Sequence, residues 1–209
     1  LTGEVAGFSH DGIRVVAANL GPGVNPITFS DDGRLFVAQC FFGDGLYEID
    51  PLGEKEPRSI RDDLGPRCGL NGMDWGPDNR LYGPRWFDNE VISVDVDTGE
   101  SRVEVSGLQV PAAVKFNSAG ELHILDTAAG TVLRRNTDGS VEVVARLETG
   151  LDNFAFDNED NLFVSSYADG SIVRVSGDSA EEVLPGGISH PGGLTVLDET
   201  LVLSLIHIS

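Results

Sequence analysis

Four residues recur at one position of a repeated segment, and three of them could bind a cation or a substrate. Asn25, Asn71, Ala112 and Asp152 each stand ten residues before a leucine. Two carboxamides and one carboxylate offer hard oxygen atoms, which calcium accepts at about 2.3–2.6 Å in flexible geometry. Zinc fits less well, because the sequence has no cysteine or histidine cluster with zinc-ligand spacing. The column therefore predicts a divalent-metal site, with calcium as the expected ion.

The leucines that follow this column mark a repeat of about 40 residues. They are separated by 46, 41, 40 and 39 residues, at Leu35, Leu81, Leu122, Leu162 and Leu201. Apolar residues eight and six positions before the first four leucines alternate with residues of other types, which predicts a strand. Two positions before those leucines stand residue types that tolerate the positive φ of a tight hairpin, namely Gly33, Asn79, Gly120 and Asp160.

Two further strands are expected after each leucine, so each repeat holds four short strands. Four strands in about 40 residues are typical of a β-propeller blade. Segment 3–20 matches segment 130–147 without a gap, and segment 192–203 resembles only the first half of a repeat. The sequence therefore predicts an all-β fold, a β-propeller incomplete at both ends. Six blades are expected once the missing ends are restored.

One propeller domain is expected over residues 1–202, with partial first and last blades. Residues 203–209 are interpreted as a sequencing-adapter remnant, and a genuine apolar strand is the alternative. The chain does not begin with methionine, so we expect the start of the protein to be missing. The compartment, cytoplasmic or secreted and periplasmic, therefore stays open.

Charge and composition limit the classes of partner. The 209 residues carry 34 acidic and 14 basic side chains, a formal net charge of −20. Such a surface repels phosphate backbones, so nucleic acid is not an expected partner. No apolar run approaches the roughly 20 residues of a membrane span. Whether Cys40 and Cys68 pair is not decided by the sequence, and a buried, inert thiol is the expectation for Cys68.

The repeat also predicts which loops share a face with the polar column. First residues of inner strands line the mouth of a propeller channel, and the loops after each second strand lie on that face. Arg85, Trp86 and Tyr167 fall in these loops and are expected to contact substrate. His190 precedes the last inner strand and could move a proton near neutral pH. Blade packing for Arg85 and Trp86, and turn stabilisation for His190, are the alternatives.

The segment NGMDWGPDNRLYGPRWFDNEVISVDVDTGE from Asn71 resembles the senescence-marker-protein, gluconolactonase and regucalcin family. The copies NPITFSDDGRLFVA and DNFAFDNEDNLFVSS extend the resemblance over most of the chain. In that family the asparagine that matches Asn71 binds a divalent metal at the centre of the ring. Asp152–Asn153 looks like the aspartate–asparagine pair that paraoxonases place on calcium, and Asn153 is expected to contact substrate.

The resemblance implies a metal-dependent hydrolase of lactones or related esters. Asn71, Asp152 and Asn25 would hold the ion, although Asn25 could instead cap a turn. Asp152 or His190 would move the proton, and no GxSxG motif suggests a serine nucleophile. Ala112 departs from the family, because an aspartate ligand is expected there. A non-catalytic binding propeller, which Ala112 favours, therefore remains an alternative. A propeller lyase acting on cyclic esters is a third possibility, at which His190 hints.

Overall fold

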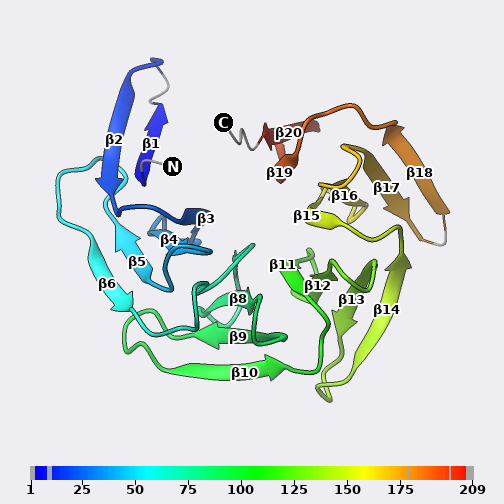
Figure 1. Cartoon of the computed structure of the whole chain (residues 1–209), viewed down its shortest axis with the longest axis horizontal. Helices are drawn as coiled ribbons and strands as arrows, with labels where there is room; N and C mark the ends of the chain where they lie inside the picture. Colours follow the sequence, from blue (N-terminus) through cyan, green and yellow to red (C-terminus); the bar gives the residue numbers. More distant parts are fainter. Residues whose placement is uncertain (1–2, 9–10, 178, 198, 206–209) are drawn as a thin grey trace. The chain divides into compact units, whose positions relative to one another are not determined.

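The chain is built of β-strands that form the sheets of a β-propeller, as the repeat predicts (Figure 1). A computed structural model describes residues 3–8, 11–177, 179–197 and 199–205. These described residues contain no helix, and so none that could cross a bilayer. Their strands form four four-stranded sheets and two two-stranded sheets. The chain divides into two compact units, Leu1–Val103 and Glu104–Ser209, and each is described by itself.

The first unit holds a two-stranded sheet followed by two blades. The two-stranded sheet is β1 (Glu4–Phe8) and β2 (Arg14–Asn19). The first blade contains β3 (Val24–Phe29), β4 (Leu35–Gln39), β5 (Leu46–Ile49) and β6 (Arg58–Arg61). The second contains β7 (Asp74–Trp75), β8 (Leu81–Arg85), β9 (Glu90–Val94) and β10 (Ser101–Val105), and the unit boundary falls within β10.

The second unit repeats this pattern in the opposite order, with two blades and then a two-stranded sheet. One blade contains β11 (Pro111–Phe116), β12 (Leu122–Asp126), β13 (Thr131–Arg135) and β14 (Val141–Arg146). The next contains β15 (Leu151–Phe156), β16 (Leu162–Ser166), β17 (Ile172–Ser176) and β18 (Ser179–Leu184). The last sheet is β19 (Pro191–Leu197) and β20 (Thr200–Leu205). The segment interpreted as an adapter remnant begins inside β20, and its residues 206–209 lie outside the described part.

The hairpins between first and second strands have the backbone that their residue types predict. Gly33, Asn79, Gly120 and Asp160 adopt φ values of 86°, 60°, 74° and 60°. Positive φ closes a tight antiparallel hairpin, and glycine, asparagine and aspartate adopt it at little steric cost. The spacing that locates the blades therefore reflects local turn chemistry.

The core is formed by side chains that point alternately to the two faces of the second strand of a blade. In β4, Leu35 and Val37 pack toward β1–β2, together with Ala17 and Ala18. The intervening Phe36 packs with Met73, Leu81 and other residues of the second blade. Both faces of the second strand are thus buried between neighbouring sheets, which explains its continuous apolar sequence.

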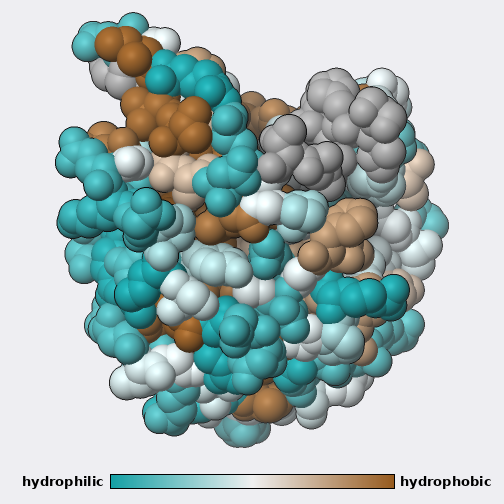
Figure 2. Space-filling view, turned by 60° about the vertical axis from the view of Figure 1, so that its left-hand side comes forward, coloured by the Kyte–Doolittle hydropathy of each residue, from teal (hydrophilic) through white to brown (hydrophobic). Residues whose placement is uncertain are grey.

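The β1–β2 hairpin is less well covered than the complete blades. Phe8 and Ile13 are 75% and 64% exposed. Figure 2 shows apolar atoms gathered on this hairpin, in the upper left of the view. A sheet of two strands has too little backbone to bury both of its faces.

Candidate functional site

The polar column lies where the inner strands lose regular pairing. Ala112 is the extra residue in the pairing of β11 with β12, and Asp152 is the extra residue in the pairing of β15 with β16. The register of β3 against β4 also shifts across Asn25. A β-bulge changes the direction of a side chain and often lies next to a functional site. The column found by spacing is therefore also a position of distinct backbone geometry.

Asn71 differs from the rest of the column because it precedes a shortened strand. The sequence predicts an inner strand that starts near Asn71, but β7 contains only Asp74 and Trp75. Asn71 N–H donates to the Pro84 carbonyl of β8 at 3.0 Å. Proline has no N–H to return to the facing strand, so the regular ladder cannot continue past it. Asn71 is nevertheless 9% exposed and well fixed in position.

Asn25 and Asn71 contact each other directly. Asn25 Nδ2 donates a hydrogen bond of 2.9 Å to Asn71 Oδ1, and the Gly72 N–H donates to the same oxygen at 3.1 Å. The hydrogen bond joins neighbouring blades of the first unit, at residues 46 positions apart in sequence. The structure therefore brings together two of the three residues predicted to bind the ion.

Asp152 lies in the second unit and is unusual in its electrostatics. No hydrogen bond or ion pair joins its carboxylate to another described residue, and burial raises its pKa from 3.8 to about 6. Desolvation disfavours the charged form of a carboxyl group, which accounts for the direction of the shift. The neighbouring Asn153 is engaged locally, since its Oδ1 accepts a hydrogen bond of 2.9 Å from Phe154 N–H.

His190 and Tyr167 meet at the edge of the second unit. Their ring centroids are 4.7 Å apart, and Ser189 Oγ lies 2.9 Å from His190 Nδ1. Tyr167 follows β16 and His190 precedes β19, while β15, which carries Asp152, packs beside β19. His190 is exposed and adopts a φ of 49°. The four residues predicted for proton transfer and substrate contact in this unit thus come from adjacent elements.

The side chains of Arg85 and Trp86 lie in different surroundings, although the two residues are adjacent in sequence. The Arg85 guanidinium forms ion pairs with Asp88 at 2.5 Å and Glu90 at 2.8 Å. Two carboxylates at this distance satisfy most of its charge. The Trp86 ring lies edge-on to Phe41, with centroids 5.9 Å apart.

A disulfide joins Cys40 to Cys68 and connects the two blades of the first unit. The inert thiol expected for Cys68 is therefore wrong. Spacing could not reveal the pair, because the cysteines are 28 residues apart in loops of different blades. Cys68 lies three residues before Asn71, and the adjacent Gly69 N–H donates to the Gln39 carbonyl at 2.9 Å. The bond thus fixes the loop that leads into the polar column.

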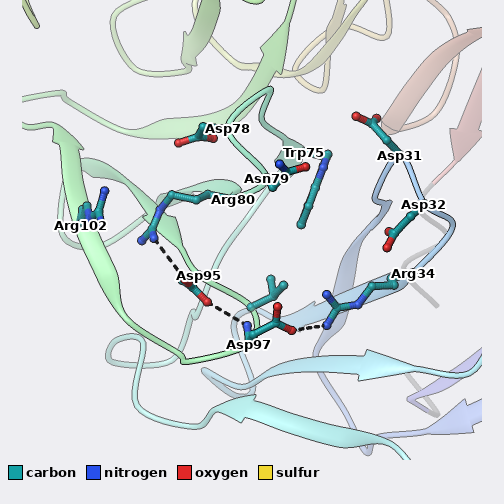
Figure 3. A pocket seen from close by; sticks show the side chains of 11 residues that line it. Asp31, Asp32, Arg34, Trp75, Asp78, Asn79, Arg80, Asp95, Asp97 and Arg102 are labelled. Atoms are coloured by element: carbon teal, nitrogen blue, oxygen red, sulfur yellow. Dashed lines mark hydrogen bonds and ion pairs between the residues drawn. The ribbon is translucent and has the colours of Figure 1, made fainter.

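A cavity of about 650 Å³ lies in the first unit, at the strand turns rather than at the polar column (Figure 3). Its lining contains Asp31, Asp32, Arg34, Trp75, Asp78, Asn79, Arg80, Asp95, Val96, Asp97 and Arg102. Arg34 bridges Glu48 and Asp97 at 2.8 and 2.9 Å and so links the two blades. Hydrogen bonding to Arg34 lowers the pKa of Glu48 to about 2. None of the predicted site residues lines this cavity, and its ion pairs serve the packing of the blades.

Comparison with known proteins reveals the fold but no family. No protein-family model and no curated protein sequence matches the chain. An inactive variant of virginiamycin B lyase from Staphylococcus aureus, solved with quinupristin, aligns with a TM-score of 0.77 at 15% identity. That alignment covers 97% of this chain and 71% of the lyase. The fold is that of a β-propeller.

Two other similar structures belong to different functional classes. A nidogen/laminin complex aligns with a TM-score of 0.70 and 17% identity, over 86% of this chain and 70% of that one. A proposed gluconolactonase aligns with a TM-score of 0.68 and 18% identity, over 92% of this chain and 73% of that one. Identities this low support a shared propeller architecture and leave the chemistry to the site itself.

The donor atoms of the column suit calcium in type. Amide and carboxylate oxygens are the ligands that this ion prefers. Because Asn71 Oδ1 already accepts two N–H groups, a cation there requires the Asn25 amide to turn its own oxygen inward. Among the described residues, no group of three or more His, Cys, Asp or Glu side chains is arranged to hold a metal. Calcium binding therefore stays a prediction.

His123 is a buried packing residue of the second unit. It is 6% exposed, and its ring lies edge-on to Phe156 with centroids 4.9 Å apart. Burial lowers its pKa, so the neutral ring is favoured. The sequence reveals this role because aromatic residues occupy the same column in the other complete blades.

Proposed function

We propose that the protein is a hydrolase of lactone or ester substrates. The observation that carries this proposal is the Asp152 carboxyl, which lies half-buried at a bulge, where desolvation raises its pKa to about 6. A general acid or base works best when its pKa lies near the working pH. Groups with such displaced pKa values concentrate at functional sites. The family resemblance around Asn71 supports the same class of reaction.

In this proposal the residues of the chain have separate roles. Asp152, as the carboxylate, accepts a proton from the attacking water and returns it to the leaving oxygen as the acyl C–O bond breaks. His190 is the second candidate for this proton transfer. The Asn25–Asn71 pair binds the ion or the carbonyl oxygen, where amide groups can stabilise developing negative charge. Arg85, Trp86, Asn153 and Tyr167 are the proposed substrate contacts.

Calcium is the proposed cofactor, held by Asn71, Asp152 and Asn25 as their shared repeat column predicts. When bound, such an ion polarises a carbonyl and assists ionisation of water. In its absence Asp152 would keep the raised pKa that burial imposes. Calcium binding should therefore lower that pKa, because a nearby positive charge favours the carboxylate.

The test is hydrolysis of simple lactones with calcium and with a chelator. Asp152→Ala is expected to reduce kcat by about a hundredfold or more, as loss of an acid–base group does. Asn71→Ala should raise the calcium concentration needed for activity. Asp138→Ala, in an exposed hairpin turn, is the matched control and should leave the rate unchanged. Hydrolysis that is insensitive to chelation and to both site substitutions would refute the proposal.

A lyase is the second enzymatic candidate, favoured by the Tyr167–His190 ring contact. Such a pair could remove a proton next to an ester, and one similar structure is a lyase. Water enriched in ¹⁸O separates the two reactions. Hydrolysis places the label in the carboxylate product, whereas elimination breaks the same ester without incorporating it.

A binding propeller without catalysis is the remaining candidate, favoured by Ala112. This residue is 1% exposed and supplies no ligand atom from its side chain at the column. One similar structure is a nidogen/laminin complex. Calorimetry that detects neither calcium binding nor turnover, on correctly folded protein, would favour this class.

A further inference from the structure

Four aromatic side chains gather in the loops beside Asn71, and we call them the aromatic rim: Phe41, Phe42, Trp86 and Phe87. Phe41, Phe42 and Phe87 are 47%, 67% and 39% exposed. Single exposed apolar residues are ordinary on a protein surface, but a contiguous group usually marks a binding surface. The rim lies entirely within the first unit.

Three rings of the rim, those of Phe41, Trp86 and Phe87, form an ordered cluster. Phe41 meets Trp86 edge-on, at 5.9 Å and 69°, and meets Phe87 edge-on, at 6.3 Å and 89°. Edge-to-face contacts of this kind are the favoured geometry of aromatic pairs. They also leave ring faces open, on which a flat ligand group can stack.

The backbone beneath the rim is held in unusual conformations. Phe41 and Arg67 adopt φ values of 68° and 73°, in the left-handed region that bulky residues rarely enter. Each is adjacent to a cysteine of the Cys40–Cys68 disulfide. Such conformations persist only where the surrounding structure enforces them, and they concentrate at ligand sites. The disulfide therefore fixes the direction in which Phe41 projects.

The rim and the asparagine pair share the same supporting loops. Cys40 N–H donates to the Gly23 carbonyl at 2.7 Å, and Gly23 lies two residues before Asn25. A Cβ at Gly23 would come within 3.1 Å of Phe42 Cβ, so Phe42 lies directly over this glycine. On the other side, the Pro84 carbonyl that binds Asn71 N–H is two residues before Trp86.

Arg67 adds a positive charge to an otherwise acidic protein. Its Cζ lies 4.8 Å from the Phe87 ring centroid, in cation–π geometry. Arg85 is neutralised by two carboxylates, but Arg67 forms no ion pair within the described part of the chain. It is exposed and can attract a carboxylate to the rim.

We propose that the aromatic rim and Arg67 select ligands with an aryl group, namely aryl-substituted lactones or esters and their aryl hydroxy-acid products. The ring of the ligand stacks on Phe41 and Trp86, and Arg67 attracts the carboxylate of the product. This inference rests on the proposed hydrolase for its substrate class, but the binding surface itself can be tested without turnover.

The test compares two matched lactones and their hydroxy-acid products. Dihydrocoumarin carries a benzene ring fused to a six-membered lactone, and δ-valerolactone is the same lactone without the ring. The protein contains 2 tryptophans, so a Trp75→Phe background leaves Trp86 as the single fluorescent reporter. Quenching of Trp86 then gives the Kd of each hydroxy acid, whether or not the lactones are hydrolysed.

The aryl hydroxy acid should bind more tightly than the alkyl one. Phe41→Ala should weaken aryl binding about fivefold, the effect of losing one aromatic pair, and leave alkyl binding unchanged. Phe41→Leu keeps the apolar volume but should also lose the preference. Arg67→Gln should weaken both acids and remove the dependence of affinity on salt. Phe8→Ala, which removes an exposed phenylalanine outside the rim, is the control and should change nothing.

The outcomes separate this inference from the proposed function. Lactone hydrolysis in which Phe41→Leu leaves the ratio of kcat/KM for the two lactones unchanged would overturn the rim and leave the hydrolase intact. Rim-dependent aryl binding without hydrolysis would support the rim and refute the hydrolase. Equal affinity of the folded protein for the two acids would also overturn the rim.

Discussion

Asp152→Asn should stabilise the protein at neutral pH, although it removes a proposed functional group. Burial raises the pKa of Asp152 from 3.8 to about 6. Each pKa unit corresponds to about 1.4 kcal/mol, so the full shift destabilises the fold by about 3 kcal/mol above pH 6. This is an upper limit, because the side chain keeps partial contact with water.

The sign follows from proton linkage. The folded state holds the Asp152 proton more tightly than the unfolded state, so wild-type stability falls as pH rises from about 4 through about 6. Asparagine does not titrate here. The advantage of Asp152→Asn should therefore grow from about 1 kcal/mol near pH 4.5 to about 3 kcal/mol near pH 8.

The assay is urea unfolding across this pH range in the presence of a chelator, with an unchanged slope against urea. Asp126→Asn is the control of opposite sign. Asp126 is buried, and its carboxylate accepts backbone hydrogen bonds at 2.7 and 2.9 Å, so the amide should lose stability throughout. A gain for Asp152→Asn that does not change with pH, or a loss near pH 8, would refute the reasoning.

Three further predictions concern single contacts. His123→Phe should reduce the loss of stability between about pH 7 and pH 5, because burial lowers the pKa of His123 from 6.5 and the unfolded state takes up the proton; unfolding with the wild-type pH dependence would contradict this. Replacing Cys40 and Cys68 by serine should lower the free energy of unfolding by about 3–4 kcal/mol, from the entropy of closing a loop of 28 residues, and a reductant should then have no further effect. Ala112→Asp should destabilise the protein by about 3 kcal/mol or more when a chelator keeps it free of calcium, because it introduces an unpaired buried charge. Calcium should restore the stability if residues 112 and 152 face one ion. A variant whose stability does not respond to calcium would exclude a shared ion.

The fold could be predicted because its determinants are local. Alternation fixes which residues face each neighbouring sheet, and turn residues such as Asn79 fix where each hairpin closes. β7 is the exception. The proline on the facing strand β8 has no backbone N–H to donate to β7, and the strand propensity of the residues in β7 does not reveal this loss. The short length of β7 thus depends on a residue of the strand that pairs with it, so it cannot be predicted from the residues of β7 alone.

The contact between Asn25 and Asn71 could be predicted from the repeat, but the surroundings of the candidate site residues could not. The shared column brings Asn25 to Asn71, as their hydrogen bond of 2.9 Å confirms. The isolation of Asp152 could not be read from sequence, because it depends on which donors neighbouring strands fail to supply. The Cys40–Cys68 pair and the left-handed Phe41 have the same origin, in contacts between loops of different blades.

Blades with the same backbone bulge at the column carry side chains of different chemistry. Ala112 and Asp152 are both extra residues in their strands, although only one has a polar side chain. The irregularity therefore belongs to the blade, and the side chain at that position decides what is presented. Around the column, Asn25 and Asn71 present amides, Asp152 presents a carboxyl group and Ala112 presents a methyl group. A propeller can thus gain or lose a ligand by one substitution at this position without changing how its strands pair.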